Sequence, residues 1–469
     1  MRQCFYKIFF FFALIEFFPA SLSATPKSLV SKMASLITKT AGPLVPWAKQ
    51  FPIESRYLTR THFIQGEGLT LMSNTGVNHL DMTAGYGSIN LGRRYSGVEN
   101  AVNTQRSSGL LHLQSDVDHP LRHELNSRLL CYSPIENTGR CFFTLGGNNA
   151  VEAAYSIVRR AIQKKDPSRG NLIAAISQGY SGASSMLPAR ITGEADRRSA
   201  FSSHCSNSVI HIDHPQAGGV ETSSHPMIEK IESIGPEKFT AIHLEGGGYT
   251  ATSGGYHLSK KYLTELFEYA KKHDIPIVDD ETYTGFGRTG DRFGISHSGL
   301  KPSIVLGAKA ITNGEGSLGY VIISPDFADI YDDEAMDFGL TFFAPLSDSA
   351  AAIAVLEAFE KKGDLLYANA NLMGDLLKEK IETYLEDTAT NAVIRHKGLL
   401  MVIELREPSG ELWSNDKFAK LKSELADRHQ VITMGRKGKL MLTPALTINE
   451  DQVEWAASAI QKAILNLEK

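Results

Sequence analysis

The chain has 469 residues, roughly three times the length of a typical domain, so at least two hydrophobic cores are expected. Its composition, 42% hydrophobic and 21% charged residues, excludes an intrinsically disordered protein. The net charge of −4 gives no basic excess that would favour nucleic acid, and four cysteines without CxxC spacing are too sparse for a disulfide framework. Small molecules are therefore the expected partners.

The first 24 residues differ from the rest of the chain. Arg2 and Lys7 precede an apolar run over 8–15, and small residues follow as far as Ala24. This pattern is typical of a secretory signal peptide and is too short for a comfortable membrane span. A start placed too far upstream, with Met33 as the true start, explains the same segment. The first interpretation predicts export and the second a cytoplasmic protein, and both stand.

From about residue 70 to 340, apolar segments of strand length alternate with helical patterns. Ser259 has the position of an N-cap before a helix whose apolar residues fall on one face. Short, unbroken apolar strands that alternate with helices predict an α/β domain with a mostly parallel sheet covered on both faces. The expected strands are 141–144, 172–176, 209–212, 240–244, 275–278, 304–306 and 320–323, and the expected helices are 150–164 and 259–273.

From Ser347 onward the pattern changes to that of a smaller α+β domain. No low-complexity linker separates the two parts, which indicates that a continuous helix joins them. The expected helices are 347–360, 365–385, 417–428 and 452–467, and strand patterns occupy 393–405 around Gly398, 431–434 and 440–442.

Polar residues directly follow three of the predicted strands, where open α/β sheets bind their ligands. The acids 279–281 follow one strand and Lys309 follows another. A glycine turn over 146–147 opens a helix, whose free backbone N–H groups and dipole favour an anion. Each feature alone has a common structural explanation as a cap, a surface lysine or a tight turn. Together, an anion site, a carboxylate and a lysine indicate pyridoxal 5'-phosphate (PLP).

Two other ligand motifs are weaker. The segment 285–290 matches GxGxxG, but no predicted strand directly precedes it and no helical pattern follows, which disfavours a dinucleotide site. His119 and His123 have the i,i+4 spacing of metal ligands. Pro120 after Asp118 nevertheless favours the start of a surface helix.

One segment carries a family pattern. Residues 280–290 read DETYTGFGRTG, and Lys309 follows 19 residues later. This resembles the DE-x-x-TGFGRTG signature of the class III (ω-amino acid) aminotransferases of PLP fold type I. The resemblance covers about 60–465, and its further matches are 81–85, 147–148, 152–154, 180–182, Glu245, Thr341 and 398–399.

The resemblance implies a fold and a domain layout. The expected fold is the PLP-dependent transferase fold type I, with a large domain built on a mostly parallel mixed sheet and a smaller C-terminal α+β domain. The large PLP-binding domain is expected over 71–345 and the small domain over 346–469. An N-terminal segment over 25–70 would pack on the small domain, after a signal peptide over 1–24 in the exported interpretation.

The resemblance also implies two catalytic residues. Lys309 would form a Schiff base with PLP and, once displaced by the substrate amine, would move the proton. Asp280 would contact the pyridine nitrogen and keep it protonated, so that the ring accepts electrons. The implied reaction moves an amino group between an ω-amino acid or amine and a 2-oxo acid by a ping-pong route.

The remaining implied contacts hold the cofactor. Gly147 and Asn148 would bind its phosphate, Tyr180 would stack on its ring, and Thr282 would lie on the other face. Thr341 would reach the phosphate of the neighbouring subunit, which implies an obligate homodimer with a shared active site.

Several residues depart from the family pattern. The arginine that usually grips the substrate α-carboxylate is replaced by Met441, with Arg436 or Lys439 as displaced candidates. A glutamate/2-oxoglutarate half-reaction is less secure without this guanidinium. The other departures are Gly146 for serine, Asn149 for glutamate, Ser181 for histidine, Tyr283 for glutamine, Gly246 for proline and Thr250 for an acid.

Two alternatives stand beside the aminotransferase. The first is another PLP reaction on the same scaffold, an aminomutase or a racemase. The second is a non-catalytic dimer that binds PLP or nothing. This last alternative is disfavoured because a chain freed from catalysis has no physical reason to keep both Lys309 and Asp280.

Overall fold

The computed structural model describes residues 61–135, 139–199, 208–217, 225–331 and 338–468. The expected signal peptide and most of the expected N-terminal segment, 25–70, lie outside the described residues. Within the described part of the chain, no helix is both long and apolar enough for a membrane span.

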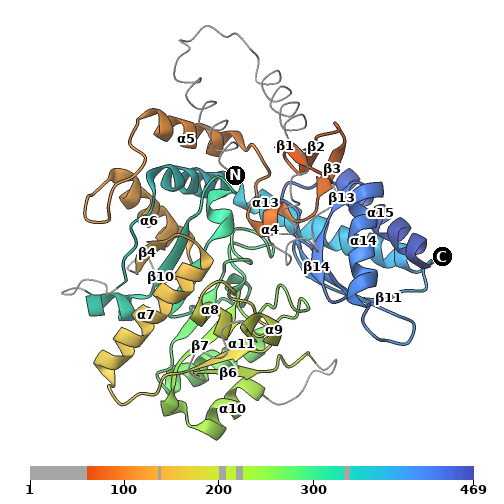
Figure 1. Cartoon of the computed structure of the whole chain (residues 1–469). Helices are drawn as coiled ribbons and strands as arrows, with labels where there is room; N and C mark the ends of the chain where they lie inside the picture. The colour runs from red at the N-terminus through yellow and green to blue at the C-terminus, as the bar shows by residue number, and fades with distance from the viewer. Residues whose placement is uncertain (1–60, 136–138, 200–207, 218–224, 332–337, 469) are drawn as a thin grey trace, which may run out of the picture. The chain divides into compact units, whose positions relative to one another are not determined.

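A seven-stranded sheet forms the centre of the larger part of the fold (Figure 1). Its order is β4-β10-β9-β8-β7-β5-β6; neighbours from β9 to β6 run parallel, and β10 is antiparallel to both β4 and β9. The predicted mostly parallel, mixed sheet is thus confirmed. The strands are β4 (Arg140–Thr144), β5 (Leu172–Ile176), β6 (Val209–Ile212), β7 (Phe239–Glu245), β8 (Ile277–Asp280), β9 (Ile304–Gly307) and β10 (Gly319–Ile323).

Helices cover both faces of this sheet because consecutive side chains of a strand point to opposite sides. On β5, Ile173 and Ala175 pack with α7, whereas Ala174 and Ile176 pack with α10 and α11. The predicted cap is confirmed, since the Ser259 hydroxyl accepts a hydrogen bond from the N–H of Tyr262 at 3.2 Å. The helices of this part are α4 (Ala84–Gly87), α5 (Ser96–Ser107), α6 (Pro120–Tyr132), α7 (Gly147–Lys165), α8 (Met186–Ile191), α9 (Ala195–Arg198), α10 (Pro226–Ile234), α11 (Lys260–Lys272) and α12 (Pro325–Ala328).

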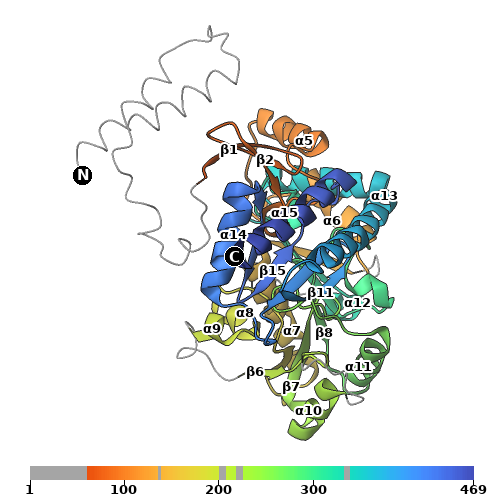
Figure 2. The same cartoon turned by 90° about the vertical axis from the view of Figure 1, so that its right-hand side faces the viewer.

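A single helix of 40 residues, α13 (Leu346–Leu385), runs from the large part into the small one (Figure 2). The two helices expected over 347–360 and 365–385 are therefore one. Gly363 costs a helix only about 1 kcal/mol relative to alanine, and here it is buried within continuous helix. The helix packs against α5 and α6 and also against α15 (Glu450–Glu468), so tertiary contacts override the local weakness.

The C-terminal part is built on a four-stranded sheet of order β11-β12-β15-β14. Gly398, with φ of +53°, forms the turn between β11 and β12, which splits the strand pattern over 393–405 into a hairpin. Helix α14 packs on β13 and β14. The bounds are β11 (Asn391–Lys397), β12 (Leu400–Arg406), α14 (Asn415–Arg428), β13 (Val431–Ile432), β14 (Met434–Arg436) and β15 (Lys439–Leu442).

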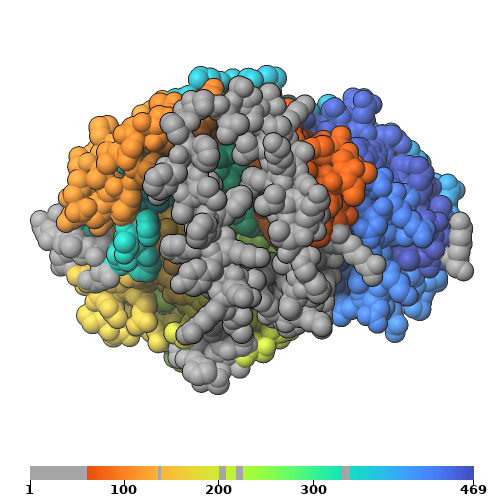
Figure 3. Space-filling view, turned by 45° about the horizontal axis from the view of Figure 1, so that its top comes forward, coloured from red at the N-terminus to blue at the C-terminus, as the bar shows by residue number. Residues whose placement is uncertain are grey.

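A third sheet joins the start of the described chain to this C-terminal part. Strands β1 (Phe63–Glu67), β2 (Thr70–Ser73) and β3 (Asn78–Asp81) form a meander, and β13 pairs in parallel with β3. Figure 3 shows the surface of these first strands, in orange-red, beside the blue C-terminal residues. The domain limits expected from the sequence stay predictions.

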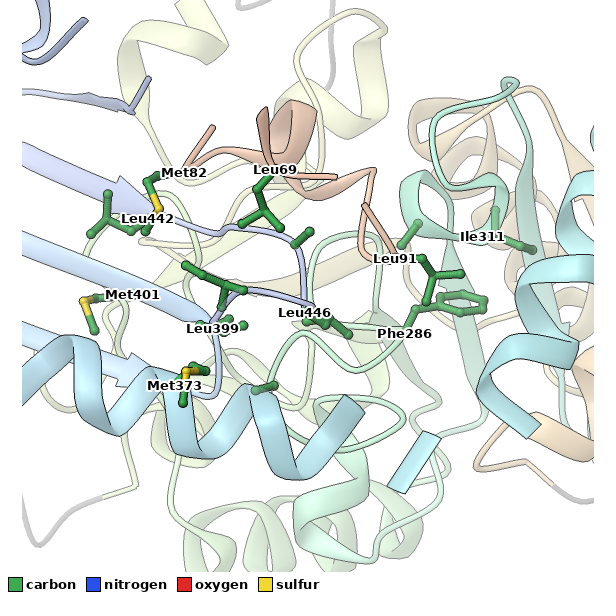
Figure 4. Close-up of a cluster of buried hydrophobic side chains, with 14 of the residues drawn as sticks. Leu69, Met82, Leu91, Phe286, Ile311, Met373, Leu399, Met401, Leu442 and Leu446 are labelled. Carbon is green, nitrogen blue, oxygen red and sulfur yellow. The ribbon is translucent and has the colours of Figure 1, made fainter. Parts of the chain in front are cut away.

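The apolar core continues from one part of the fold into the other (Figure 4). Phe286 and Ile311 lie on the side of the seven-stranded sheet, and Leu399 and Met373 lie toward the C-terminal sheet. Phe286 belongs to the DETYTGFGRTG segment and stacks on Tyr132 with ring centroids 5.3 Å apart. Because burial of each such side chain stabilises by roughly 1.5–3 kcal/mol, this shared core holds the sheets around the site in a fixed arrangement.

Candidate active site

One cavity of about 350 Å³ lies at the carboxyl ends of the central strands. Glu245 ends β7, Asp280 ends β8, and Lys309 follows β9; in the register of the sheet, Glu245 pairs with Asp280. Parallel strands bring these ends to one edge of the sheet, so the three charged side chains line the same cavity. The other lining residues are Gly146, Gly147, Asn148, Asn149, Tyr180, Ser181, Gly182, Ser184, Thr282 and Tyr283.

Lys309 is held in a strained backbone conformation with its amine inside the cavity. Its φ is +52°, which a residue with a Cβ adopts only when the surrounding structure imposes it. The ammonium nitrogen lies 3.7 Å from the centroid of the Tyr283 ring. Burial lowers the pKa of Lys309 to about 8, although Asp280 and Glu245 act in the opposite direction. A useful fraction of the amine is therefore neutral, and hence nucleophilic, near physiological pH.

Two buried carboxyl groups face this single amine. Asp280, only 3% exposed, accepts a hydrogen bond from the N–H of Thr282 at 3.0 Å, and burial raises its pKa. Glu245 accepts from the N–H groups of Tyr180 at 3.0 Å and Ala251 at 3.3 Å, and burial raises its pKa to about 8. Buried charges need partners, so the cavity favours a ligand that brings a positive group.

The glycine turn supplies the opposite end of the cavity. Helix α7 begins at Gly147 without a side-chain cap, so the first N–H groups of its 19 residues have no partner within the helix. A Cβ at Gly147 would lie 3.1 Å from Thr282, and one at Gly182 would overlap the side chain of Asn148. The backbone thus approaches the cavity closely, as an anion site at a helix N-terminus requires.

These groups fit PLP. The uncapped start of α7 suits its phosphate, Asp280 suits a protonated ring nitrogen, and Lys309 suits its aldehyde. The family model described as "Aminotransferase class-III" matches residues 55–464. The chain belongs to the class III aminotransferases.

Known proteins agree with this assignment. An acetylornithine aminotransferase of Aquifex aeolicus (strain VF5) is 24% identical over 343 residues, covering 73% of this chain and 83% of the relative. A taurine–pyruvate aminotransferase of Bilophila wadsworthia (strain 3_1_6) is 24% identical over 435 residues, covering 87% and 92%. The crystal structure of an (S)-enantioselective omega-transaminase from Thermomicrobium roseum superimposes with a TM-score of 0.81 at 24% identity, covering 96% of this chain and 100% of that chain. The predicted fold type, PLP dependence and transaminase activity are confirmed.

The transaminase does not bring every expected residue into its cavity. Of the cofactor contacts that the resemblance implies, Gly147, Asn148, Tyr180 and Thr282 line the cavity, whereas Thr341 is exposed and lies outside it. A contact of Thr341 with a neighbouring subunit stays a prediction.

None of the three positions considered for the substrate carboxylate offers an unpaired guanidinium among the described residues. Met441 is buried in a cluster of apolar and aromatic side chains that includes Tyr283 of the cavity. Arg436 is bound by Glu194 at 2.7 Å and by Asp196, and Lys439 donates to the Ser253 carbonyl at 2.6 Å. Both displaced candidates thus have acidic or carbonyl partners. Lys309 is the one cationic side chain among the described residues that line the cavity.

Arg288, in the middle of the signature, received no role from the sequence. It is fully buried and donates hydrogen bonds to Asn90 Oδ1 at 2.6 Å, to the Leu399 carbonyl at 3.1 Å and to the Pro444 carbonyl. Burial lowers its pKa to about 10. The signature arginine therefore ties the loop after β8 to the C-terminal part. The segment 285–290 forms turns, without the strand and helix of a dinucleotide site.

The two histidines with metal-ligand spacing lie at a helix start, as predicted. Pro120 is the first residue of α6, and His119 Nδ1 accepts a hydrogen bond from the N–H of Leu121 at 3.2 Å. His123 is bound to the exposed Asp118 at 2.7 Å. The cap is thus His119, and Pro120 takes the first helical position that the sequence predicts.

Proposed function

We propose that the transaminase uses Lys309 for covalent and proton-transfer chemistry and Asp280 as the partner of the cofactor ring nitrogen. The observation that carries this assignment is their placement after neighbouring strands, in one cavity, opposite the uncapped start of α7. We further propose that the amino donor is an amine or ω-amino acid and that the acceptor is a 2-oxo acid.

Each residue has a stated task in this proposal. When bound, PLP supplies an aldehyde that combines with amines and a ring that takes up the electrons of a broken C–H bond. Lys309 offers an amine that is partly neutral at physiological pH, and it accepts and returns the proton of the substrate carbon. Asp280 holds a proton on the ring nitrogen. The α7 start, with Gly147 and Asn148, binds the phosphate.

The remaining contacts orient the ring. Tyr180 and Thr282 line the cavity and would lie on its two faces. Thr341, which is exposed in its own chain, would bind the phosphate held by the neighbouring subunit. A homodimer with a shared active site is therefore part of the proposal.

The choice of donor rests on what surrounds the substrate side. Met441 stands where the family has an arginine, and it packs in an apolar cluster with Tyr283. Arg436 and Lys439 are already bound to other groups. Among the described residues, a carboxylate next to the reacting amine would find no bidentate partner at Met441, Arg436 or Lys439, so donors without an α-carboxylate are favoured.

Borohydride reduction of the purified holoenzyme followed by peptide mapping tests the assignment of Lys309. The cofactor is expected on Lys309, and Lys309→Ala should lose the visible absorption band. Attachment to another lysine would overturn the assignment.

A panel of amines tested with pyruvate and with 2-oxoglutarate, while the cofactor spectrum is followed, tests the reaction. Amines that lack an α-carboxylate are expected to change the spectrum and to need a 2-oxo acid for turnover. Turnover without any 2-oxo acid would indicate an aminomutase or racemase instead. No spectral change with any amine would indicate a non-catalytic protein.

A further inference from the structure

Behind Asp280, three buried polar side chains from three elements form a hydrogen-bonded chain. The Tyr155 hydroxyl on α7 lies 3.1 Å from Nδ1 of His243 on β7, and His243 Nε2 lies 2.6 Å from Oγ of Ser181, in the loop after β5. Ser181 lines the same cavity as Asp280, and hydrogen bonding by Ser181 acts to lower the pKa of that carboxyl group. Tyr155, His243 and Ser181 are only 1%, 3% and 7% exposed, so water does not replace these contacts.

The hydrogen bonds that link these side chains have one set of directions in which every donor has an acceptor. An ionised Asp280 only accepts, so Ser181 donates to it, and Ser181 Oγ is then free to accept from His243 Nε2–H. His243 Nδ1 is left without a proton and accepts from the Tyr155 hydroxyl. This assignment requires a neutral imidazole, and burial indeed lowers the pKa of His243 to about 3. The three protons are thus all directed toward Asp280.

These hydrogen-bonded side chains counteract the effect of burial on the pKa of Asp280. Removal from water raises the pKa of this carboxyl group, whereas hydrogen bonding by Thr282, the charge of Lys309 and hydrogen bonding by Ser181 lower it. A fully buried imidazole is costly unless both ring nitrogens are paired, and here both are. Ser181 occupies the position where the resemblance predicts a histidine, and the imidazole of this cluster belongs to His243 on β7.

We propose that Tyr155, His243 and Ser181 form a relay that orients Asp280 and keeps it ionised against the ring nitrogen of the cofactor. These three are positioning residues, because they act through Asp280 and not on the substrate. The proposal rests on the role given to Asp280 under the proposed function.

Two cofactors distinguish this role from simple packing: PLP itself, and its analogue in which CH replaces the ring nitrogen. Both carry the same phosphate and aldehyde, and only PLP interacts with Asp280 through the ring nitrogen. We therefore measure the dissociation constant of each compound from the apoprotein, for the wild type and for the variants. The ratio of the two constants isolates the contribution of the ring nitrogen.

Ser181→Ala is expected to weaken PLP binding about tenfold while leaving the analogue unchanged, which is the loss of one hydrogen bond to a charged group. Tyr155→Phe should also weaken PLP binding, but by a smaller factor, because the Tyr155 hydroxyl is two hydrogen bonds further from Asp280 than Ser181 is. His243→Gln keeps a donor and an acceptor and should be milder than His243→Leu. Should His243→Leu fail to fold, Ser181→Ala and Tyr155→Phe still decide the question.

Tyr320→Phe is the matched control. It also removes a buried hydroxyl from the same sheet, but that hydroxyl has no hydrogen-bond partner among the described residues, and its ratio should equal that of the wild type. Relay variants that weaken both compounds equally, or neither, would overturn the relay and leave the role of Asp280 intact. A wild type that binds both compounds equally would overturn the role of Asp280 and, with it, the relay.

Discussion

Replacing Asp280 by asparagine tests the charge at the heart of the site. The substitution keeps the shape of the side chain and removes its negative charge. Asp280 is 3% exposed and uses one oxygen for the N–H of Thr282 at 3.0 Å, so its remaining capacity faces the cavity, which Ser181 also lines. Asparagine would leave a protonated ring nitrogen without its counter-charge, and the ring would lose its proton.

The size of the effect follows from the burial of this group. Removing one partner of a buried, hydrogen-bonded charge pair costs about 3–5 kcal/mol. If that loss falls on the step in which the C–H bond breaks, the rate constant falls about 10²- to 10⁴-fold, at about 1.4 kcal/mol per factor of ten. The rate constant is measured in a single-turnover half-reaction, by the spectral change of the bound cofactor after an amine is added.

Asp279→Asn is the control for this experiment. Asp279 is equally buried and adjacent in sequence, but its Oδ1 accepts from the N–H of Gly247 at 2.7 Å and it does not line the cavity. We expect the half-reaction of this variant to stay close to the wild-type rate. Equal losses of rate in both variants, or an unaffected rate in Asp280→Asn, would refute the assignment of Asp280.

Three further outcomes are expected. The rate at which Lys309 captures PLP in the apoprotein, followed by stopped-flow absorbance, should rise about tenfold per pH unit below pH 8 and level off above it, because only the neutral amine reacts and its pKa is about 8. Gly182→Ala should displace Asn148 and weaken PLP binding about tenfold in a spectroscopic titration, whereas Gly299→Ala, whose added methyl meets open space, should not. Arg288→Met leaves three buried acceptors unpaired, at about 1–3 kcal/mol each, and should lower the calorimetric melting temperature by several degrees; an unchanged melting temperature would contradict its role as a tie between the two parts.

The sequence predicted the elements whose local pattern is unambiguous. The run 172–176 is continuously apolar and the run 209–212 is apolar except for His211; both are bounded by polar residues, and they coincide with β5 and β6. The sequence predicted two helices, 347–360 and 365–385, but contacts on both sides of the intervening Gly363 keep α13 continuous. The low helix propensity of one glycine is outweighed by the packing of a helix of 40 residues.

The residues of the site likewise fall into those that the sequence could identify and those that it could not. Asp280 and Lys309 were recognisable because Asp280 lies at the carboxyl end of a buried strand and Lys309 lies just beyond one, and a strand end is a local feature. Arg288 and His243 gave no such signal, because their partners lie far away in the chain: Asn90 and Pro444 for the arginine, Tyr155 and Ser181 for the histidine. Their functions depend on contacts that only the folded sheet creates.

The long helix α13 has a mechanical consequence for turnover. At 1.5 Å per residue, its 40 residues make a rod of about 60 Å that is anchored against α5 and α6 near one end and against α15 near the other. The cavity has to open when product is exchanged for the next amine. Residues 346–385 form a continuous helix, so they offer no flexible linker as a hinge for this movement. Helix α13 itself has to bend. We expect the bending to concentrate at Gly363, which lacks a side chain, and to produce small movements of the C-terminal part.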